Sequence, residues 1–221
     1  MGHPPRRGRT ILAFGESHTD THALKELVAA LRPDLPVVAP RQQPIILARR
    51  AATAKAMTVA ERVTKLVRAE QVQTDVIAVL AHRDLDAIDP RETADEILAN
   101  ERELRDSLAA VAASGVAVVP VVPAWEMEAW WFLWPEQVAA HRSAWRRLPD
   151  HSGKRVDRIT RAKETLTRAL RPVGRKSVPD YSESDGARIA AQVRTAGTAR
   201  SPRGRSLAYE TFVAMIDALK P

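Results

Sequence analysis

The chain has 221 residues, of which 45% are hydrophobic and 28% are charged, and its formal net charge at pH 7 is +7. This composition predicts one substantial hydrophobic core and argues against a disordered chain. The absence of cysteine excludes disulfide bonds and thiolate metal sites, which leaves carboxylates and histidines as metal ligands. No apolar run is long enough to cross a membrane, and the basic segment 1–9 lacks the apolar core of a signal peptide, so we expect a cytoplasmic protein without membrane contact.

The N-terminal part begins with a strand and a helix. The apolar run Ile11–Phe14 predicts a buried strand. Ser17 and Asp20, three residues apart, form a plausible cap for the helix that follows. The core face of this helix is formed by apolar residues at helical spacing: Leu24, Leu27, Val28 and Leu31.

The middle of the chain repeats this alternation. A proline-rich stretch holds two β-like pieces, at 36–38 and 45–47, which favours an edge strand or a hairpin. We then predict a helix over Met57–Glu70, a buried strand over Asp75–Leu80, a long helix over Arg91–Ala113 closed by Gly115, and a strand over Val116–Val122. This rhythm predicts an α/β fold with a mainly parallel sheet and helices on both faces.

The last third of the chain has a different character. All five tryptophans lie between Trp125 and Trp145, in a helical stretch broken by Pro135, and we expect them in the core or an interface rather than stacked on bases. Three further helices are predicted: Arg155–Leu170, Glu183–Val193 and Ser206–Leu219. We therefore predict an α/β catalytic domain over residues 1–148 and a basic helical extension over 149–221 that packs on it.

The positive charge is concentrated in this extension. Residues 151–206 hold 14 Lys and Arg against 5 Asp and Glu, a net charge of +9, so the remainder of the chain carries −2. Such a segment is either an ordinary solvated surface or a footprint for nucleic acid. On the second interpretation, the candidate nucleic-acid-binding residues are Arg155, Arg158, Arg175, Lys176, Arg203 and Arg205.

Acidic residues follow three of the predicted strands. Gly15-Glu16 follows the first, Asp84-Leu85-Asp86 comes after a later one, and Glu126-Met127-Glu128 follows the strand that ends near 122. Ligands bind outside the carboxyl ends of parallel strands, so these acids are expected to share one crevice. Their mutual repulsion is best relieved by a divalent cation, and oxygen ligands suit Mg²⁺ or Mn²⁺.

Each acid also has a simpler interpretation. Asp84 and Asp86 point the same way along an extended chain and can face one ion, but they can also cap a helix or solvate a turn. Glu16 can instead complement a helix dipole. Glu126 and Glu128 would point about 200° apart on a helix, so we expect only one in the pocket and choose Glu128, with Glu126 as the alternate.

The Phe14-Gly15-Glu16-Ser17 and His82-Arg83-Asp84-Leu85-Asp86 segments resemble the TOPRIM fold of topoisomerases, bacterial primases and the nuclease domains of OLD-family (overcoming lysogenization defect) proteins. The segment 126–130, Glu-Met-Glu-Ala-Trp, is similar to that of small stand-alone TOPRIM-like proteins of bacterial defence loci. The Tyr181 to Gly186 segment echoes the tail pattern of the same proteins, in which a tyrosine is followed by Asp-Gly.

The resemblance implies a TOPRIM-like nuclease that cleaves DNA or RNA as an anti-phage defence effector. It implies a pair of Mg²⁺ or Mn²⁺ ions held by Glu16, Asp84, Asp86 and Glu128. A lysine stabilises the transition state in related nucleases, and Lys163 or Lys176 is the candidate here. Two alternatives stay open: a non-catalytic subunit held by an ATPase of the same locus, docked through the tryptophan cluster, and a primase- or topoisomerase-like activity. A homo-oligomer is also compatible with the sequence.

Overall fold

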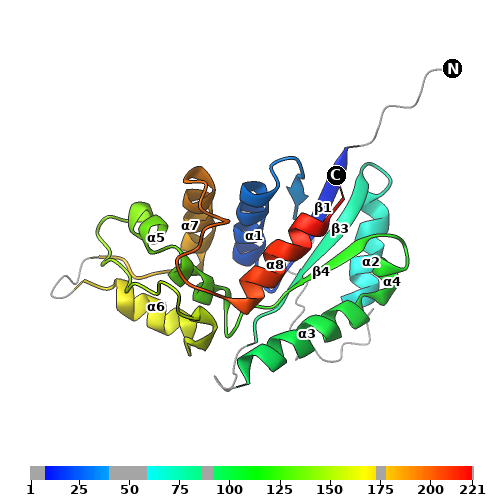
Figure 1. The fold of residues 1–221 in the computed structure, drawn as a ribbon. Coiled ribbons are helices and arrows are strands. Elements are labelled where there is room, and N and C mark those ends of the chain that lie inside the picture. Colours follow the sequence, from blue (N-terminus) through cyan, green and yellow to red (C-terminus); the bar gives the residue numbers. More distant parts are fainter. Residues whose placement is uncertain (1–7, 40–58, 86–91, 173–177, 221) are drawn as a thin grey trace.

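A central parallel sheet organises the chain (Figure 1). The structure, a computed structural model, describes residues 8–39, 59–85, 92–172 and 178–220. Its strands are β1 (Arg9–Phe14), β2 (Val37–Val38), β3 (Asp75–His82) and β4 (Ala117–Val121), in the order β2-β1-β3-β4. All three pairings are parallel. The predicted α/β fold with a mainly parallel sheet is confirmed.

Helices cover both faces of the sheet because strand side chains alternate between the faces. Ile11 and Ala13 pack in a core with α1 (His18–Leu31) and α8 (Leu207–Ala218), whereas Leu12 and Phe14 belong to a second core. Three helices form the other side of this second core: α2 (Val59–Glu70), α3 (Thr93–Ser107) and α4 (Ala109–Ala112).

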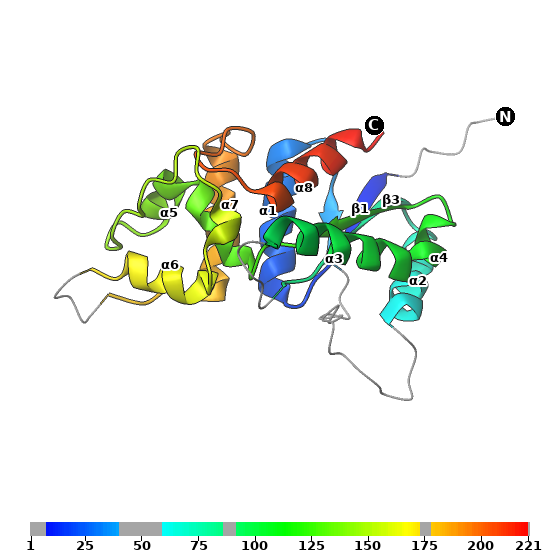
Figure 2. The ribbon, with the colours of Figure 1, turned by 60° about the horizontal axis from the view of Figure 1, so that its bottom comes forward.

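A second group of helices lies at one side of the sheet, beyond α1 and away from α2 and α4 (Figure 2). They are the 3₁₀ helices η1 (Met127–Leu133) and η2 (Val156–Arg158) and the helices α5 (Pro135–His141), α6 (Ala162–Leu170) and α7 (Glu183–Thr195). The α7 helix packs along α1, and both α6 and η2 pack on η1. The segment that carries Glu128 is therefore central to this group.

The tryptophans of η1 and of the residue that follows it belong to the core. Trp130, Trp131 and Trp134 are at most 1% exposed. The Trp130 and Trp134 rings meet the Tyr209 ring edge-on, with centroids 5.1 and 4.9 Å apart. These rings therefore join η1 to α8. This agrees with the expectation that the tryptophans lie in the core. They do not form the docking surface on which the non-catalytic alternative relied.

Several local predictions need correction. Of the two alternatives for the proline-rich stretch, the edge strand is confirmed, because β2 lies at the edge of the sheet and pairs in parallel with β1, whereas the second β-like piece, 45–47, lies outside the described residues. The long helix predicted up to Ala113 is interrupted at Leu108, where backbone angles of −104° and 19° leave the helical range. The helix predicted over Arg155–Leu170 is divided into η2 and α6. In the described ranges, no helix is both long and apolar enough to span a membrane.

Candidate active site

The strand order places a crevice beside β1 and β3. The chain leaves β1 toward β2 in one direction and then returns to β3 on the other side, so α1 and α2 cover opposite faces. This reversal is the topological switch point at which open α/β sheets bind ligands. Glu16 is the second residue after β1, and Asp84 is the second residue after β3. Two predicted metal ligands therefore lie at this switch point.

His82, the last residue of β3, is fully buried between two carboxylates. Its Nε2 lies 3.1 Å from Asp84 Oδ1, and its Nδ1 lies 3.9 Å from Asp20 Oδ2. Burial by itself lowers the pKa of His82, but the negative charges of Asp84, Asp20 and Glu16 outweigh it and raise the pKa to about 9. This raised pKa favours the imidazolium form of His82 at neutral pH, whose charge attracts the carboxylates of Asp20 and Asp84 on either side of the ring.

A strained turn brings the chain after β4 back to Asp84. Trp125 has φ of 62°, a left-handed conformation that a bulky side chain rarely adopts. Met127, two residues later, donates its backbone N–H to Asp84 Oδ1 over 3.1 Å. Glu126 is extended and precedes η1, so Glu126 and Glu128 are not two residues of one regular helix. The prediction that their side chains point in nearly opposite directions therefore does not apply. The charge of Asp84 acts on both glutamates, so both lie near the end of β3, and the choice of Glu128 over Glu126 as the ligand stays a prediction.

Glu128 is the most strongly perturbed acid of this group. Its side chain is 6% exposed, and burial, followed by the charges of Asp84, Glu126 and Asp20, raises its pKa to about 8. Tyr181 donates its hydroxyl to Glu128 Oε1 over 3.2 Å and accepts from Trp131 Nε1 over 3.1 Å. Tyr181 thus fixes the orientation of Glu128, a role that the sequence pattern around Tyr181 did not indicate.

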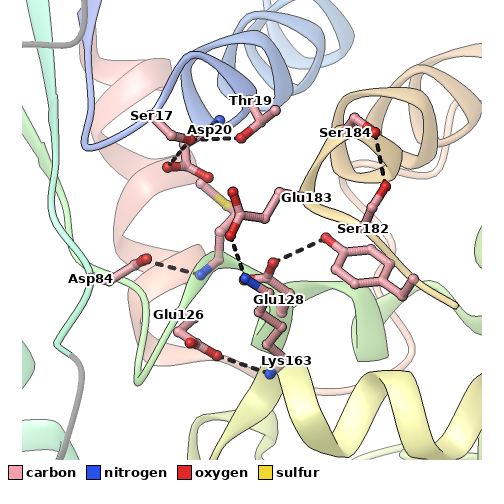
Figure 3. A network of polar contacts seen from close by, with 12 residues as sticks. Ser17, Thr19, Asp20, Asp84, Glu126, Glu128, Lys163, Ser182, Glu183 and Ser184 are labelled. Carbon is pink, nitrogen blue, oxygen red and sulfur yellow. Dashed lines mark hydrogen bonds and ion pairs between the residues drawn. The ribbon is translucent and has the colours of Figure 1, made fainter.

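Lys163 lies beside these carboxylates, at the start of α6 (Figure 3). Its backbone N–H donates to Glu126 Oε2 over 2.9 Å, and its ammonium pairs with Glu183 of α7. The hydrogen bond to Glu183 raises the pKa of Lys163, and the charges of Glu128 and Glu126 add to this effect. The structure therefore places this candidate lysine next to the acids, whereas Lys176 lies outside the described residues.

The remaining predicted residues are more dispersed. Asp86 and Arg175 lie outside the described residues. Arg203 pairs with Glu136 at 2.8 Å and Arg205 with Glu210 at 3.1 Å, so acids of the same surface already occupy both guanidinium groups. Arg155 and Arg158 are exposed on and next to η2.

The acids have the chemistry of a site for a hard cation. In the ranges that the structure covers, no group of three or more histidine, aspartate or glutamate side chains is arranged so that it could hold a metal ion. The donor set nevertheless fits Mg²⁺ or Mn²⁺, because the predicted ligands Glu16, Asp84 and Glu128 supply carboxylate oxygens, and the charges of Asp84 and Glu126 add to burial in raising the pKa of Glu128. Positive charge among them would remove that repulsion.

Comparison with known proteins assigns no family to this arrangement. The chain matches no family model. No curated protein and no solved structure matches it significantly either. The TOPRIM resemblance therefore stays a prediction, and the function has to be inferred from the site itself.

Proposed function

We propose that the chain is a cytoplasmic nuclease that uses Mg²⁺ or Mn²⁺ to hydrolyse phosphodiester bonds in DNA or RNA. The observation that carries this proposal is the convergence of carboxylates from three strand ends at the switch point, where their repulsion helps to raise the pKa of Glu128 to about 8. Acids that repel one another at a ligand-binding edge contribute little to the stability of the fold, but they favour the binding of a cation.

Each residue has a distinct role in this proposal. Glu16, Asp84 and Glu128 hold the cation, together with the predicted ligand Asp86. When bound, the ions supply a water of lowered pKa and stabilise the leaving oxygen of an in-line displacement. His82 positions Asp84 and Tyr181 positions Glu128, through the contacts given above.

Lys163 would neutralise charge on the phosphate that is attacked. To do so, its ammonium must exchange the carboxylate of Glu183 for a phosphate oxygen. Both partners of this pair are partly exposed, with side-chain exposures of 40% and 49%, so the exchange breaks an ion pair of little intrinsic stability. The TOPRIM-like motifs further suggest a role in anti-phage defence, with an ATPase of the same locus or a second copy of the chain as partner.

Cleavage assays with labelled single-stranded DNA, duplex DNA and structured RNA test the proposal. We expect Mg²⁺- or Mn²⁺-dependent cleavage of at least one substrate, its loss in EDTA, and a decrease of about 10²-fold or more in Glu16→Ala. Glu70→Ala, at the end of α2 on the far side of the molecule, is the matched control and should cleave like the wild type. Cleavage that persists in EDTA or in Glu16→Ala would contradict the assignment, and so would the absence of cleavage with all three substrates.

A further inference from the structure

A pocket runs along one face of α6, beginning at the acids. Its volume is about 520 Å³, and its lining is formed by Glu126, Lys163, Glu164, Thr167, Arg168 and Arg171. The helical residues of this set form two adjacent rows with a spacing of four, Lys163, Thr167 and Arg171 in one row and Glu164 and Arg168 in the other, so they lie on one side of the helix. Glu126 belongs both to this lining and to the carboxylate group around Asp84. The pocket, hereafter the α6 pocket, is therefore continuous with the candidate active site.

The surroundings of the α6 pocket are strongly basic. Residues 151–171 contain seven Lys and Arg and two Asp and Glu, a net charge of +5. One of the two acids, Asp157, is buried and accepts from the Ser206 hydroxyl and the Leu207 N–H, so it does not offset the surface charge. Glu164 is left as the only acid that this stretch exposes. Such a surface complements a chain of phosphates rather than a neutral or cationic ligand.

Arg168 is the side chain in the lining that is best placed to bind an anion. It is exposed, and it forms no ion pair within the part of the chain that the structure describes. By contrast, Lys163 pairs with Glu183, and Arg171 pairs with Asp180, with 3.0 Å between Nε and Oδ1. From Lys163 to Arg171 the helix rises by about 12 Å, which spans more than one phosphate at about 3.4 Å per nucleotide.

We infer that the α6 pocket binds the phosphate backbone of a nucleic-acid strand on one side of the bond that is cleaved, with Arg168 as its main phosphate contact. The position relative to the cleaved bond rests on the proposed function, but the binding itself does not. Because a backbone contact carries no base information, the pocket positions the strand without selecting its sequence.

Fluorescence anisotropy tests this inference without relying on cleavage. A short fluorescein-labelled single strand of mixed sequence, as DNA and as RNA, is titrated with protein in EDTA at several salt concentrations. Arg168→Ala should weaken binding by roughly 5- to 10-fold, because it removes a charged hydrogen bond to phosphate. It should also reduce the slope of log affinity against log salt by about 0.7.

A matched control removes the same charge elsewhere. Arg68 lies in the last turn of α2, and α2 is at the opposite end of the molecule from α6 in both views (Figures 1 and 2). Arg68→Ala should therefore leave the affinity and its salt dependence unchanged. Arg168→Lys should restore most of the binding, since it retains the charge. Circular dichroism and thermal unfolding of each variant exclude misfolding as the cause.

The outcomes separate this inference from the proposed function. Weaker binding in Arg168→Ala alone supports the α6 pocket even if the wild-type chain cleaves nothing. Equal effects of Arg168→Ala and Arg68→Ala, unchanged binding in Arg168→Ala, or no binding of either strand by the wild type would overturn it, even if metal-dependent cleavage is observed.

Discussion

Asp84→Asn is expected to lower Mg²⁺-dependent cleavage by about 10²- to 10³-fold while the protein stays folded. Asparagine keeps the shape of the side chain and can still accept from the Met127 N–H, which lies 3.1 Å from Asp84 Oδ1. It removes the negative charge that acts on both His82 and Glu128. Single-turnover cleavage rates, with thermal unfolding as a check of the fold, measure the effect.

Asp106→Asn is the matched control for this experiment. Asp106 is exposed near the end of α3, so the same loss of charge there should leave the cleavage rate unchanged. If Asp84→Asn and Asp106→Asn cleave equally well, the acid at the end of β3 is not part of the catalytic site.

Asp185→Asn is expected to cause the largest loss of stability among conservative substitutions. The Asp185 carboxylate is 1% exposed and joins α7 to α5: it lies 2.8 Å from His141 Nε2 and 2.7 Å from an Arg142 guanidinium nitrogen. It also accepts from the Ser182 N–H over 3.0 Å and so caps α7. Breaking a buried charged network of this kind costs about 2–4 kcal/mol in the free energy of unfolding at pH 7.

The pH dependence of this loss follows from the pKa of Asp185. Burial acts to raise it, but hydrogen bonds from His141, Arg142 and Ser182 outweigh burial and lower the pKa from the ordinary 3.8 to about 2. Because the folded-state pKa is the lower one, the stabilisation is complete above the unfolded value and is lost as pH falls toward 2. Urea unfolding should therefore show a difference between wild type and Asp185→Asn at pH 7 that shrinks below pH 3.8.

The exposed pair of Asp217 and Arg200 provides the comparison. Its nitrogen and oxygen lie 2.7 Å apart, but the side chains are 41% and 51% exposed, so Asp217→Asn should cost less than about 1 kcal/mol. An Asp185→Asn variant as stable as Asp217→Asn, or a difference from wild type that does not change between pH 7 and 2, would show that the network contributes little.

The sheet was predictable because each of its longer strands is a continuous apolar run in the sequence. The apolar runs that became β1, β3 and β4 are buried on both faces, and Gly115 has the left-handed φ of 83° that closes the helix before β4. The break at Leu108 was not predictable, since Leu104, Leu108 and Val111 continue the helical period across it. Periodicity reports which residues face the core and does not report a local change of backbone angle.

The site was predictable only where it depends on strand ends. Glu16 and Asp84 follow from their places after β1 and β3. Asp20 had a local interpretation as a cap, which it fulfils with Ser17, and its approach to His82 depends on how α1 packs. Tyr181 reaches Glu128 across 53 positions of sequence, and Gly186 makes room for that contact because a Cβ there would lie 3.1 Å from the Trp131 ring. Such contacts depend on tertiary packing.

Calorimetric titration of Mn²⁺ into the metal-free chain, for wild type and Glu16→Ala, tests most directly whether the acids at the switch point form a cation site. We predict saturable binding to the wild type, weakened by about 10- to 100-fold in Glu16→Ala. Absence of binding to the wild type, or equal affinity in the two proteins, would contradict a metal centre between β1 and β3.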